Sequence, residues 1–435
     1  MNRKWLIAAM VLPLLGGCSS ENDAPEVVEQ IPISLSNVSG DWTQTRGQLV
    51  ESLDNFKSNA KGGGAFHVEG FKYMSADDTN PERVFTNQLV SWDKTNNEWT
   101  YSKLKFWDIA AEKYRFVGYY PANLIATSPS HLGTVDQNTL TLTNLPNWKW
   151  ISVCDDTKLH DADGNVESDD LEENPLCCEY RNGEAMDNFY DAMIAYSQGT
   201  PQTYLSGENP GYVNLHFKHI YAMFVFKVAF PNIDVGGGST KTKYVSEINI
   251  KDENGLPSAG GTFNYTFKYN TDGTTSGTYN NYEAPTQPVA EATTDVPYYG
   301  LTQFANGVDG LSTPVEALKE PHMIVRGLVV PFDLGEKVLQ FNVGYFEDAR
   351  GVTRDQKKTT WLDADGKLKT TLGIIKSANI PVKDVNNQDL HKVEAGKVYT
   401  FTINFDTGIK LDVIDVAVSE WKEYSSPITQ NFYNW

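Results

Sequence analysis

Cys18 is the residue for which the sequence specifies a chemistry most directly. Two positive charges and an apolar run precede it, and Gly16 and Gly17 stand immediately before it. This order is typical of a bacterial export signal that ends in a lipobox, in which the cysteine thiol is acylated and becomes the new N-terminus. We therefore expect residues 1–17 to be a lipoprotein signal peptide and Cys18 to carry acyl chains such as palmitate. An ordinary secretory signal with a chance cysteine is the alternative.

This leader predicts where the chain resides. Acyl chains would hold the precursor at a membrane while its body stays in water, and no other segment of the sequence is apolar for long enough to form a transmembrane helix. Residues 19–32 are polar and contain proline, as expected for a tether. Glu21 and Asp23 are similar to the signal that sends some lipoproteins to the outer cell surface. We therefore expect an outer-membrane lipoprotein precursor.

The remaining cysteines are Cys154, Cys177 and Cys178. An odd number of thiols cannot pair completely within one chain. Cys154 could form a disulfide with one of the vicinal pair in an oxidising compartment, or the thiols could stay buried and reduced. A zinc site is the weaker interpretation, because the three sulfurs have no well-placed fourth ligand.

Other candidate metal ligands are few. His216 and His219 are the only histidines close together, and on a strand residues three apart point to opposite faces, so one metal cannot bind both. The acidic segment 161–172 imitates the oxygen positions of a calcium loop, but Val166 stands where the turn requires glycine. We therefore expect no metal and no cofactor.

The sequence contains no motif that indicates catalysis. It has no G-x-S-x-G, H-E-x-x-H or phosphate-binding loop, so we expect no catalytic residues and no enzyme. A formal charge of −20 argues against a nucleic-acid partner, because such a surface repels phosphates. Trp148-Lys149-Trp150 could stack on sugar rings or fill the end of a β-sandwich, and both interpretations remain open.

The elements that would position these residues are mostly strands. Short alternating segments separated by turn residues predict an all-β fold of antiparallel β-sandwiches. The strongest block, residues 213–230, changes its alternation near Lys218 and therefore contains a bulge or a turn. A Gly- and Pro-rich stretch near residue 200 predicts a boundary between domains at residues 47–203 and 204–435, and residues 312–319 are the best candidate for a short helix.

Both ends of the body carry segments of special interest. Arg46 followed by Gly47 is open to a trypsin-like protease if its backbone is exposed. At the other end, apolar residues alternate along a long strand with a kink. They are Ile409, Leu411, Val413, Val416, Val418 and Trp421. Terminal strands are the ones that copies of a chain can exchange.

Several of these pieces together resemble a fimbrillin, the lipoprotein precursor of Bacteroidales type V pili. The matching pieces are Cys18, residues 45–47, 116–121, 215–222 and 416–421. The resemblance implies two tandem transthyretin-like antiparallel β-sandwich domains. It also implies that residues 18–46 are a tether and an N-terminal strand, which an Arg-specific protease removes by cutting after Arg46.

The resemblance further implies how subunits would join. The C-terminal strand just described would act as a donor strand and fill the groove left in another fimbrial subunit, by β-strand addition. The product would be a fimbrium at the cell surface that serves adhesion. Anchor subunits keep the N-terminal strand and lipid, and tip subunits lack a donor strand. A surface glycan-binding β-sandwich lipoprotein is the alternative function, and the tryptophans of residues 148–150 would be its platform.

Overall fold

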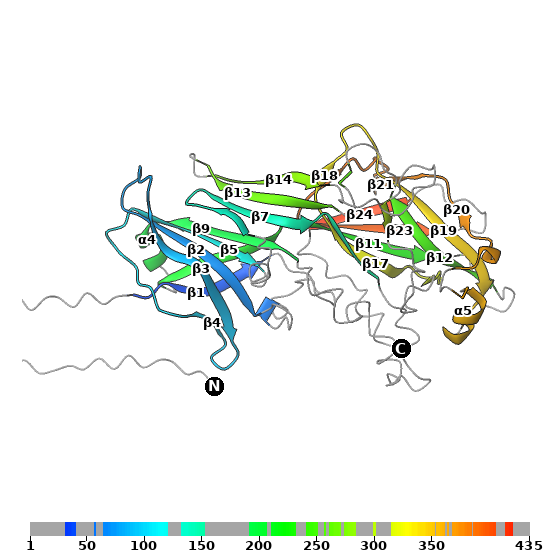
Figure 1. The fold of residues 1–435 in the computed structure, drawn as a ribbon, viewed down its shortest axis with the longest axis horizontal. Helices are drawn as coiled ribbons and strands as arrows, with labels where there is room; N and C mark the ends of the chain where they lie inside the picture. Colours follow the sequence, from blue (N-terminus) through cyan, green and yellow to red (C-terminus); the bar gives the residue numbers. More distant parts are fainter. Residues whose placement is uncertain are drawn as a thin grey trace, which may run out of the picture.

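The computed structural model describes most of the chain as two β-rich lobes, placed end to end along the long axis (Figure 1). The described residues are 31–40, 56–57, 64–120, 132–152, 191–206, 210–231, 241–250, 256–257, 261–270, 274–283, 299–301, 315–352, 354–361, 363–364, 368–384, 386–405 and 414–420. Within these ranges, no helix combines the length and apolar character needed to cross a membrane.

The N-terminal lobe is built on a seven-stranded sheet. Its strands in spatial order are β1 (Ser34–Gly40), β10 (Tyr212–His219), β9 (Met193–Gly199), β5 (Lys113–Tyr120), β2 (Ala65–Tyr73), β3 (Glu82–Asp93) and β4 (Glu98–Tyr101). β1 runs parallel to β10, and the other neighbours are antiparallel. The short helix α4 (Pro201–Leu205) connects β9 to the segment before β10 and is capped by the side chain of Thr200.

A four-stranded sheet completes this lobe. Its order is β14 (Thr275–Glu283), β13 (Thr262–Tyr269), β7 (Thr139–Pro146) and β6 (Leu132–Val135). Alternate residues of β7 and β13 are buried, as expected for strands with one face on a core. That core also contains Val117 and Tyr119 of β5, so the two sheets form a β-sandwich.

The C-terminal lobe is built on an eleven-stranded sheet. Its main path is β15 (Tyr299–Leu301), β12 (Lys241–Ile250), β19 (Gln340–Ala349), β21 (Ile380–Asp384), β24 (Ile414–Glu420), β23 (Lys397–Asn404), β11 (Ala222–Ala229), β17 (His322–Val329) and β8 (Trp148–Ser152). β16 (Val315–Glu316) pairs with β12, and β20 (Ile375–Lys376) pairs with β19. β18 (Phe332–Asp333) and β22 (Lys392–Val393) form a separate pair.

Aromatic residues fill the core of this lobe. Phe226 stacks on Phe401 at 4.8 Å between ring centroids, and Phe224 and Phe341 meet the same ring edge-on. At the outer end, α5 (Arg354–Trp361) presents Trp361 to β12 and β19, and the short 3₁₀ helix η3 (Thr370–Leu372) follows. The molecule is therefore nearly all β, as the sequence predicts.

The strong block at residues 213–230 divides between the two lobes. β10 ends at His219, the chain turns at Ile220 and Tyr221, and β11 starts in the other sheet. The predicted register change is therefore confirmed as a turn between sheets. One face of β11 joins the C-terminal core through Phe224, and the other joins the core between the lobes through Val225. Because both faces of β11 are covered, its sequence is a nearly continuous run of apolar residues.

The sequence predicts a domain boundary between residues 203 and 204, but each lobe contains strands from both sides of this position. This position falls inside α4, and β10 beyond it still belongs to the N-terminal lobe. The β13–β14 hairpin returns from the second half of the sequence to pair with β7, while β8 from the first half pairs with β17. The helix predicted over residues 312–319 is wrong, because residues 315–316 form β16 and pair with β12.

Candidate assembly site around the first strand

β1 is the feature of the N-terminal lobe with the clearest functional potential. Among the described strands it pairs with β10 alone, so it is an edge strand. Ile33 and Leu35 are each 1% exposed, and Val38 is 8% exposed. A shift in register between Ser34 and Asn37 lets odd and even positions reach the same core. The strand is therefore at the edge of the sheet but fully part of the core.

The core that receives β1 is largely aromatic. Phe56, Phe66, Trp99 and Phe217 form contacts with ring centroids 5.0 to 5.9 Å apart. These rings belong to the same cluster as Leu35 and Val38 of β1 and Ile33 immediately before it. Burial of one aliphatic side chain of this size contributes about 1.5–3 kcal/mol, so the three together contribute roughly 5–9 kcal/mol to holding the strand.

The start of β1 is anchored at Gly211. Its carbonyl accepts hydrogen bonds from the backbone N–H of Ser34 at 2.8 Å and from the indole Nε1–H of Trp107 at 3.1 Å. Gly211 has φ of +89°, and a Cβ there would lie 2.8 Å from the carbonyl oxygen of Pro32. The position therefore requires glycine for its backbone conformation and for the close approach of the β1 segment.

The other side of β1 contacts β4 and the loop that follows it. The backbone N–H of Ile33 donates to the carbonyl of Lys105 at 2.8 Å, and the Tyr101 hydroxyl donates to the carbonyl of Ile33 at 2.6 Å. The Ser36 hydroxyl donates to the carbonyl of Trp99 at 2.8 Å. β1 therefore joins the two ends of the seven-stranded sheet, yet the other six strands remain paired with one another without it.

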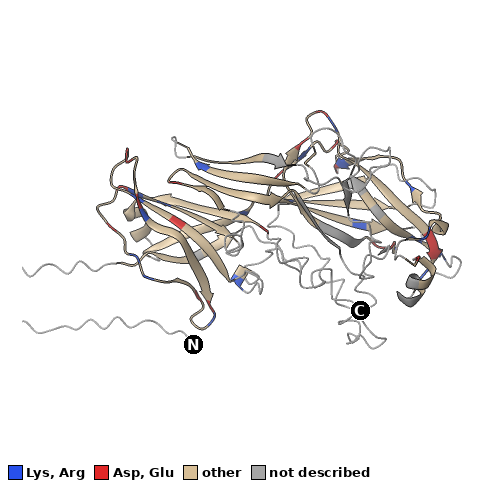
Figure 2. Cartoon of the chain, in the orientation of Figure 1, with Lys and Arg blue, Asp and Glu red and all other residues tan. Residues whose placement is uncertain are grey.

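The strand carries no charge of its own. Its sequence is polar or apolar at every position, and the β1 ribbon is tan along its length in Figure 2. Its most notable polar contact is between the Ser39 hydroxyl and His216 Nδ1, which are 3.0 Å apart. Because no ion pair fixes it, the strand is held by apolar packing and backbone hydrogen bonds, which another strand could reproduce.

β24 is the second terminal strand that the sequence singles out, and its setting differs. It lies between β23, to which it is antiparallel, and β21, to which it is parallel. Ile414 and Val416 are fully buried in the core of their own lobe, whereas Val418 is 45% exposed. The predicted donor residues outside the described part are Ile409, Leu411, Val413 and Trp421, and the predicted lipidation and cleavage residues Cys18, Arg46 and Gly47 also lie outside it.

The two neighbouring histidines lie on opposite faces of β10, as predicted. His216 is on the exposed face, and His219 is buried with its Nδ1 2.9 Å from the Asp191 carboxylate. In the described ranges, no three His, Cys, Asp or Glu side chains are placed to hold a metal ion. The backbone of residues 148–150 forms β8, and the other three cysteines and the acidic segment 161–172 lie outside the described residues.

Two buried charges in the N-terminal lobe escape sequence reasoning. Arg115 of β5 donates to Gln198 at 2.7 Å and to Asn138 at 2.8 Å, and its guanidinium lies over the ring of Tyr269. It thereby ties the two sheets of the sandwich together. Glu69 of β2 is also buried, and this burial raises the pKa of its carboxyl group. Neither residue belongs to a motif, so the sequence carries no signal for either.

Comparison with known proteins identifies the class to which this all-β chain belongs. The model of the fimbrillin-like family matches residues 57–421, so the chain is a member of that family. The match begins after β1 and ends just after β24. Membership places the chain among structural fimbrial proteins of the cell surface.

Solved structures of low sequence identity accompany this family match. A fimbrial protein from Bacteroides vulgatus is 13% identical, with 90% of this chain and 99% of that chain covered and a TM-score of 0.46. A fimbrilin from Porphyromonas gingivalis is 9% identical, with 91% and 99% covered and a TM-score of 0.32. The tip fimbrial protein of the same organism is 11% identical, with 82% and 94% covered and a TM-score of 0.30. No curated protein matches the chain.

Proposed function

We propose that this chain is a pilus subunit that assembles by exchange of its first strand. The precursor is exported as a lipoprotein anchored through Cys18, and an Arg-specific protease cuts between Arg46 and Gly47. β1 then leaves, and a terminal strand of another fimbrial subunit takes its place. The observation that carries the proposal is that β1 is an edge strand whose apolar residues fill the core.

The position of the cut relative to β1 supports this mechanism. Arg46 follows Gly40, the last residue of β1, by six residues, so cleavage would separate the whole strand from the body. Before cleavage, β1 is part of the same chain and its effective concentration at the groove is high. After cleavage it is held only by noncovalent contacts, and a donor strand with a longer apolar face can displace it.

The donor in this proposal is the C-terminal strand. Residues 409, 411, 413, 416, 418 and 421 provide its apolar side chains. Because β24 is paired on both sides, its donation requires separation from β21 and β23. Main-chain hydrogen bonds to β10 would supply affinity, and the aromatic pockets beneath β1 would supply specificity.

An anchor subunit is the second candidate, and the interior position of β24 is the observation that favours it. A chain that keeps its C-terminal strand in its own sheet has no free donor, so it would end or anchor a fibre instead of extending it. In that case the N-terminal strand and lipid would stay in place.

Limited proteolysis of residues 19–435 tests the proposal. We expect trypsin to make one early cut after Arg46, seen by mass spectrometry, followed by a ladder of oligomers in size-exclusion chromatography. Arg46→Ala should stay folded, uncut at this site and monomeric. Arg46→Lys is the matched control, because trypsin still cuts it whereas an Arg-specific protease does not. Cleavage without oligomers would favour the anchor, and normal assembly of Arg46→Ala would contradict the proposed trigger.

A further inference from the structure

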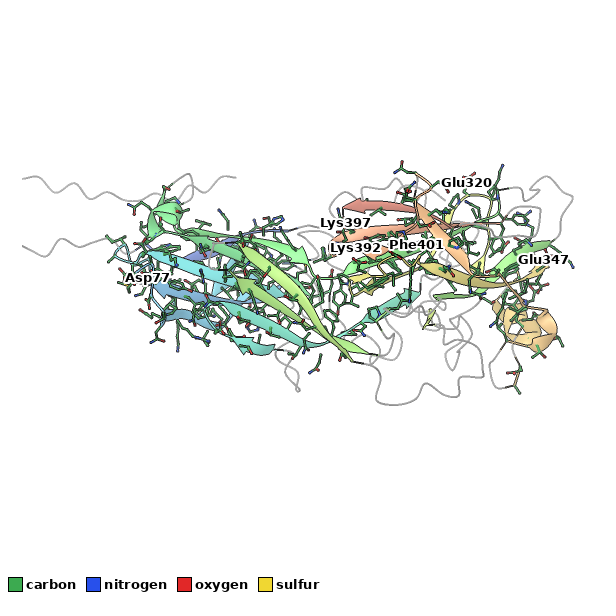
Figure 3. All side chains as sticks on the ribbon, turned by 90° about the horizontal axis from the view of Figure 1, so that it is seen from above. Asp77, Glu320, Glu347, Lys392, Lys397 and Phe401 are labelled. Atoms are coloured by element: carbon green, nitrogen blue, oxygen red, sulfur yellow. The ribbon has the colours of Figure 1, made fainter. Side chains whose placement is uncertain are left out.

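A partly open cavity of about 280 Å³ lies where the two lobes meet. Its walls come from β9, the end of β10, β13, β14 and the loop before β23, so no single segment of the sequence builds it. Figure 3 labels Lys397, the residue after the lining residue Gly396, on the part of the C-terminal lobe that faces the N-terminal lobe. The assembly mechanism proposed above does not use this site.

A mostly buried tyrosine lines the cavity and contributes a hydroxyl group to it. Tyr265 of β13 is only 7% exposed, and the structure gives its hydroxyl group no hydrogen bond to any described residue. The hydroxyl oxygen lies directly over Gly277 of β14, where any Cβ atom would collide with it. Burial raises the pKa of Tyr265 to about 12, so the group stays neutral and can both donate and accept a hydrogen bond. This hydroxyl group is therefore free to bond to water or to a ligand that enters the cavity.

Aromatic rings form the rim of the same cavity. Tyr196 of β9 is 42% exposed and leans on Phe267, with 5.5 Å between ring centroids. Tyr279 is held by the hydrogen bond that its hydroxyl donates to the carbonyl of Ile220 at 2.8 Å. Thr275 and Ser276 add hydroxyl groups to the lining. Ring faces for C–H groups together with hydroxyl groups for hydrogen bonds are the surfaces that a sugar ring requires.

The charges around the cavity restrict the ligand further. The chain has 56 acidic residues, but none of the described lining residues is Asp or Glu. The lining imidazole of His219 is 2.9 Å from the Asp191 carboxylate, and Lys218 lies on the exposed face of β10. A cationic ligand would therefore find no carboxylate in the lining, and the ammonium group of the lining residue Lys218 is exposed and not buried against a bound anion.

We propose that this cavity binds one ring of a neutral glycan, with the Tyr265 hydroxyl as a hydrogen-bond partner and the Tyr196 ring as a stacking platform. The volume of about 280 Å³ is just below the roughly 300–1,000 Å³ typical of ligand sites, which fits a ligand as small as one sugar ring. The site gives a pilus subunit a direct means of adhesion through lining residues of which none belongs to β1.

Ligand-observed NMR on the uncleaved chain, residues 19–435, tests this proposal independently of strand exchange. The probes are methyl β-galactoside, methyl α-mannoside and N-acetylglucosamine, with N-acetylneuraminic acid as an acidic probe. At least one neutral probe should show saturable binding. Tyr265→Phe removes only the hydroxyl group and should weaken that binding about two- to tenfold, and Tyr196→Ala should weaken it about tenfold or more.

Tyr212→Ala is the matched control, because Tyr212 is an exposed tyrosine at the opposite end of β10 from His219. It should leave the affinity unchanged, and unchanged thermal unfolding of all three variants would exclude a folding defect. The proposal is overturned if no neutral probe binds saturably, if only the acidic sugar binds, or if Tyr265→Phe and Tyr196→Ala both bind like the parent chain. None of these outcomes depends on whether the chain is cleaved or assembles.

Discussion

β1 and β24 are both terminal strands that bury aliphatic side chains, but only one of them can leave without dividing a sheet. β1 lies at the edge of the seven-stranded sheet beside β10. β24 lies inside the eleven-stranded sheet, and its removal would separate the strands from β15 to β21 from those from β23 to β8. Position in the sheet, and not burial alone, therefore decides which terminal strand can leave its own sheet intact, and donation by β24 carries the added cost of separating it from β21 and β23.

The largest expected effect comes from a charged side chain placed in β24. We expect Val416→Asp to destabilise the C-terminal lobe by about 4 kcal/mol or more, because an unpaired carboxylate would stand in an apolar core between two paired strands. Urea unfolding followed by circular dichroism measures the change. Val418→Asp is the control, and its exposed side chain should keep the cost within roughly 1 kcal/mol. Similar costs for the two variants would remove the case for an interior β24.

A truncation in β1 should have a smaller effect that disappears after cleavage. Leu35→Ala should cost the uncleaved chain about 2–4 kcal/mol of unfolding free energy, because it leaves a cavity among the aromatic rings. Once β1 has left, the same substitution should have no effect on the cleaved body. Unfolding of both forms measures this difference, with Ser39→Ala on the exposed side of the strand as the control. An equal cost in both forms would mean that β1 stays bound.

A substitution at Gly211, which anchors the start of β1, should have an intermediate effect on the free energy of unfolding. Gly211→Ala should cost about 1–3 kcal/mol, because φ is positive and the new Cβ would press on Pro32. Hydrogen exchange at the amides of β1 should accelerate. Gly373→Ala is the matched control, since Gly373 has φ of +62° and no heavy atom within 4 Å of the added Cβ. If the two variants cost the same, the close approach to β1 does not contribute.

The smallest expected effect concerns Glu69 of the interior strand β2 and the pH dependence of the free energy of unfolding. Because burial raises the folded-state pKa of Glu69 above its unfolded value, its contribution to stability is fully present below about pH 4.5 and is lost as the pH rises through the folded pKa. Glu69→Gln should therefore flatten the fall in unfolding free energy from pH 4.5 to neutral pH, equally before and after cleavage.

Glu98→Gln on an exposed residue of β4 is the control for Glu69→Gln and should leave the profile unchanged. If Glu69→Gln altered the profile only in the uncleaved chain, the acid would be coupled to β1. In that case, the edge strand and the interior of the sheet would be energetically coupled. The comparison of β1 with β24 requires them to be independent.

The local alternation of apolar and polar residues predicts many of the strands, but it does not predict which distant strands pair. The alternation of Ile33 and Leu35 marks β1, and the change of phase near Lys218 marks the turn between the sheets. By contrast, the return of β13 to pair with β7 depends on contacts between residues more than a hundred positions apart. The cavity at the junction also depends on such distant pairing, and the interior position of β24 depends on its parallel pairing with β21, neither of which periodicity encodes.

The most direct test of the central claim is to offer β1 back to a cleaved chain. A peptide of residues 31–40 is added after trypsin has cut the precursor at Arg46, and oligomer formation is followed by size-exclusion chromatography. The account predicts that the peptide binds and slows oligomer growth, and that the same peptide with Leu35→Asp has no effect. Oligomer growth at the same rate with either peptide would contradict the claim that β1 occupies the groove through which subunits join.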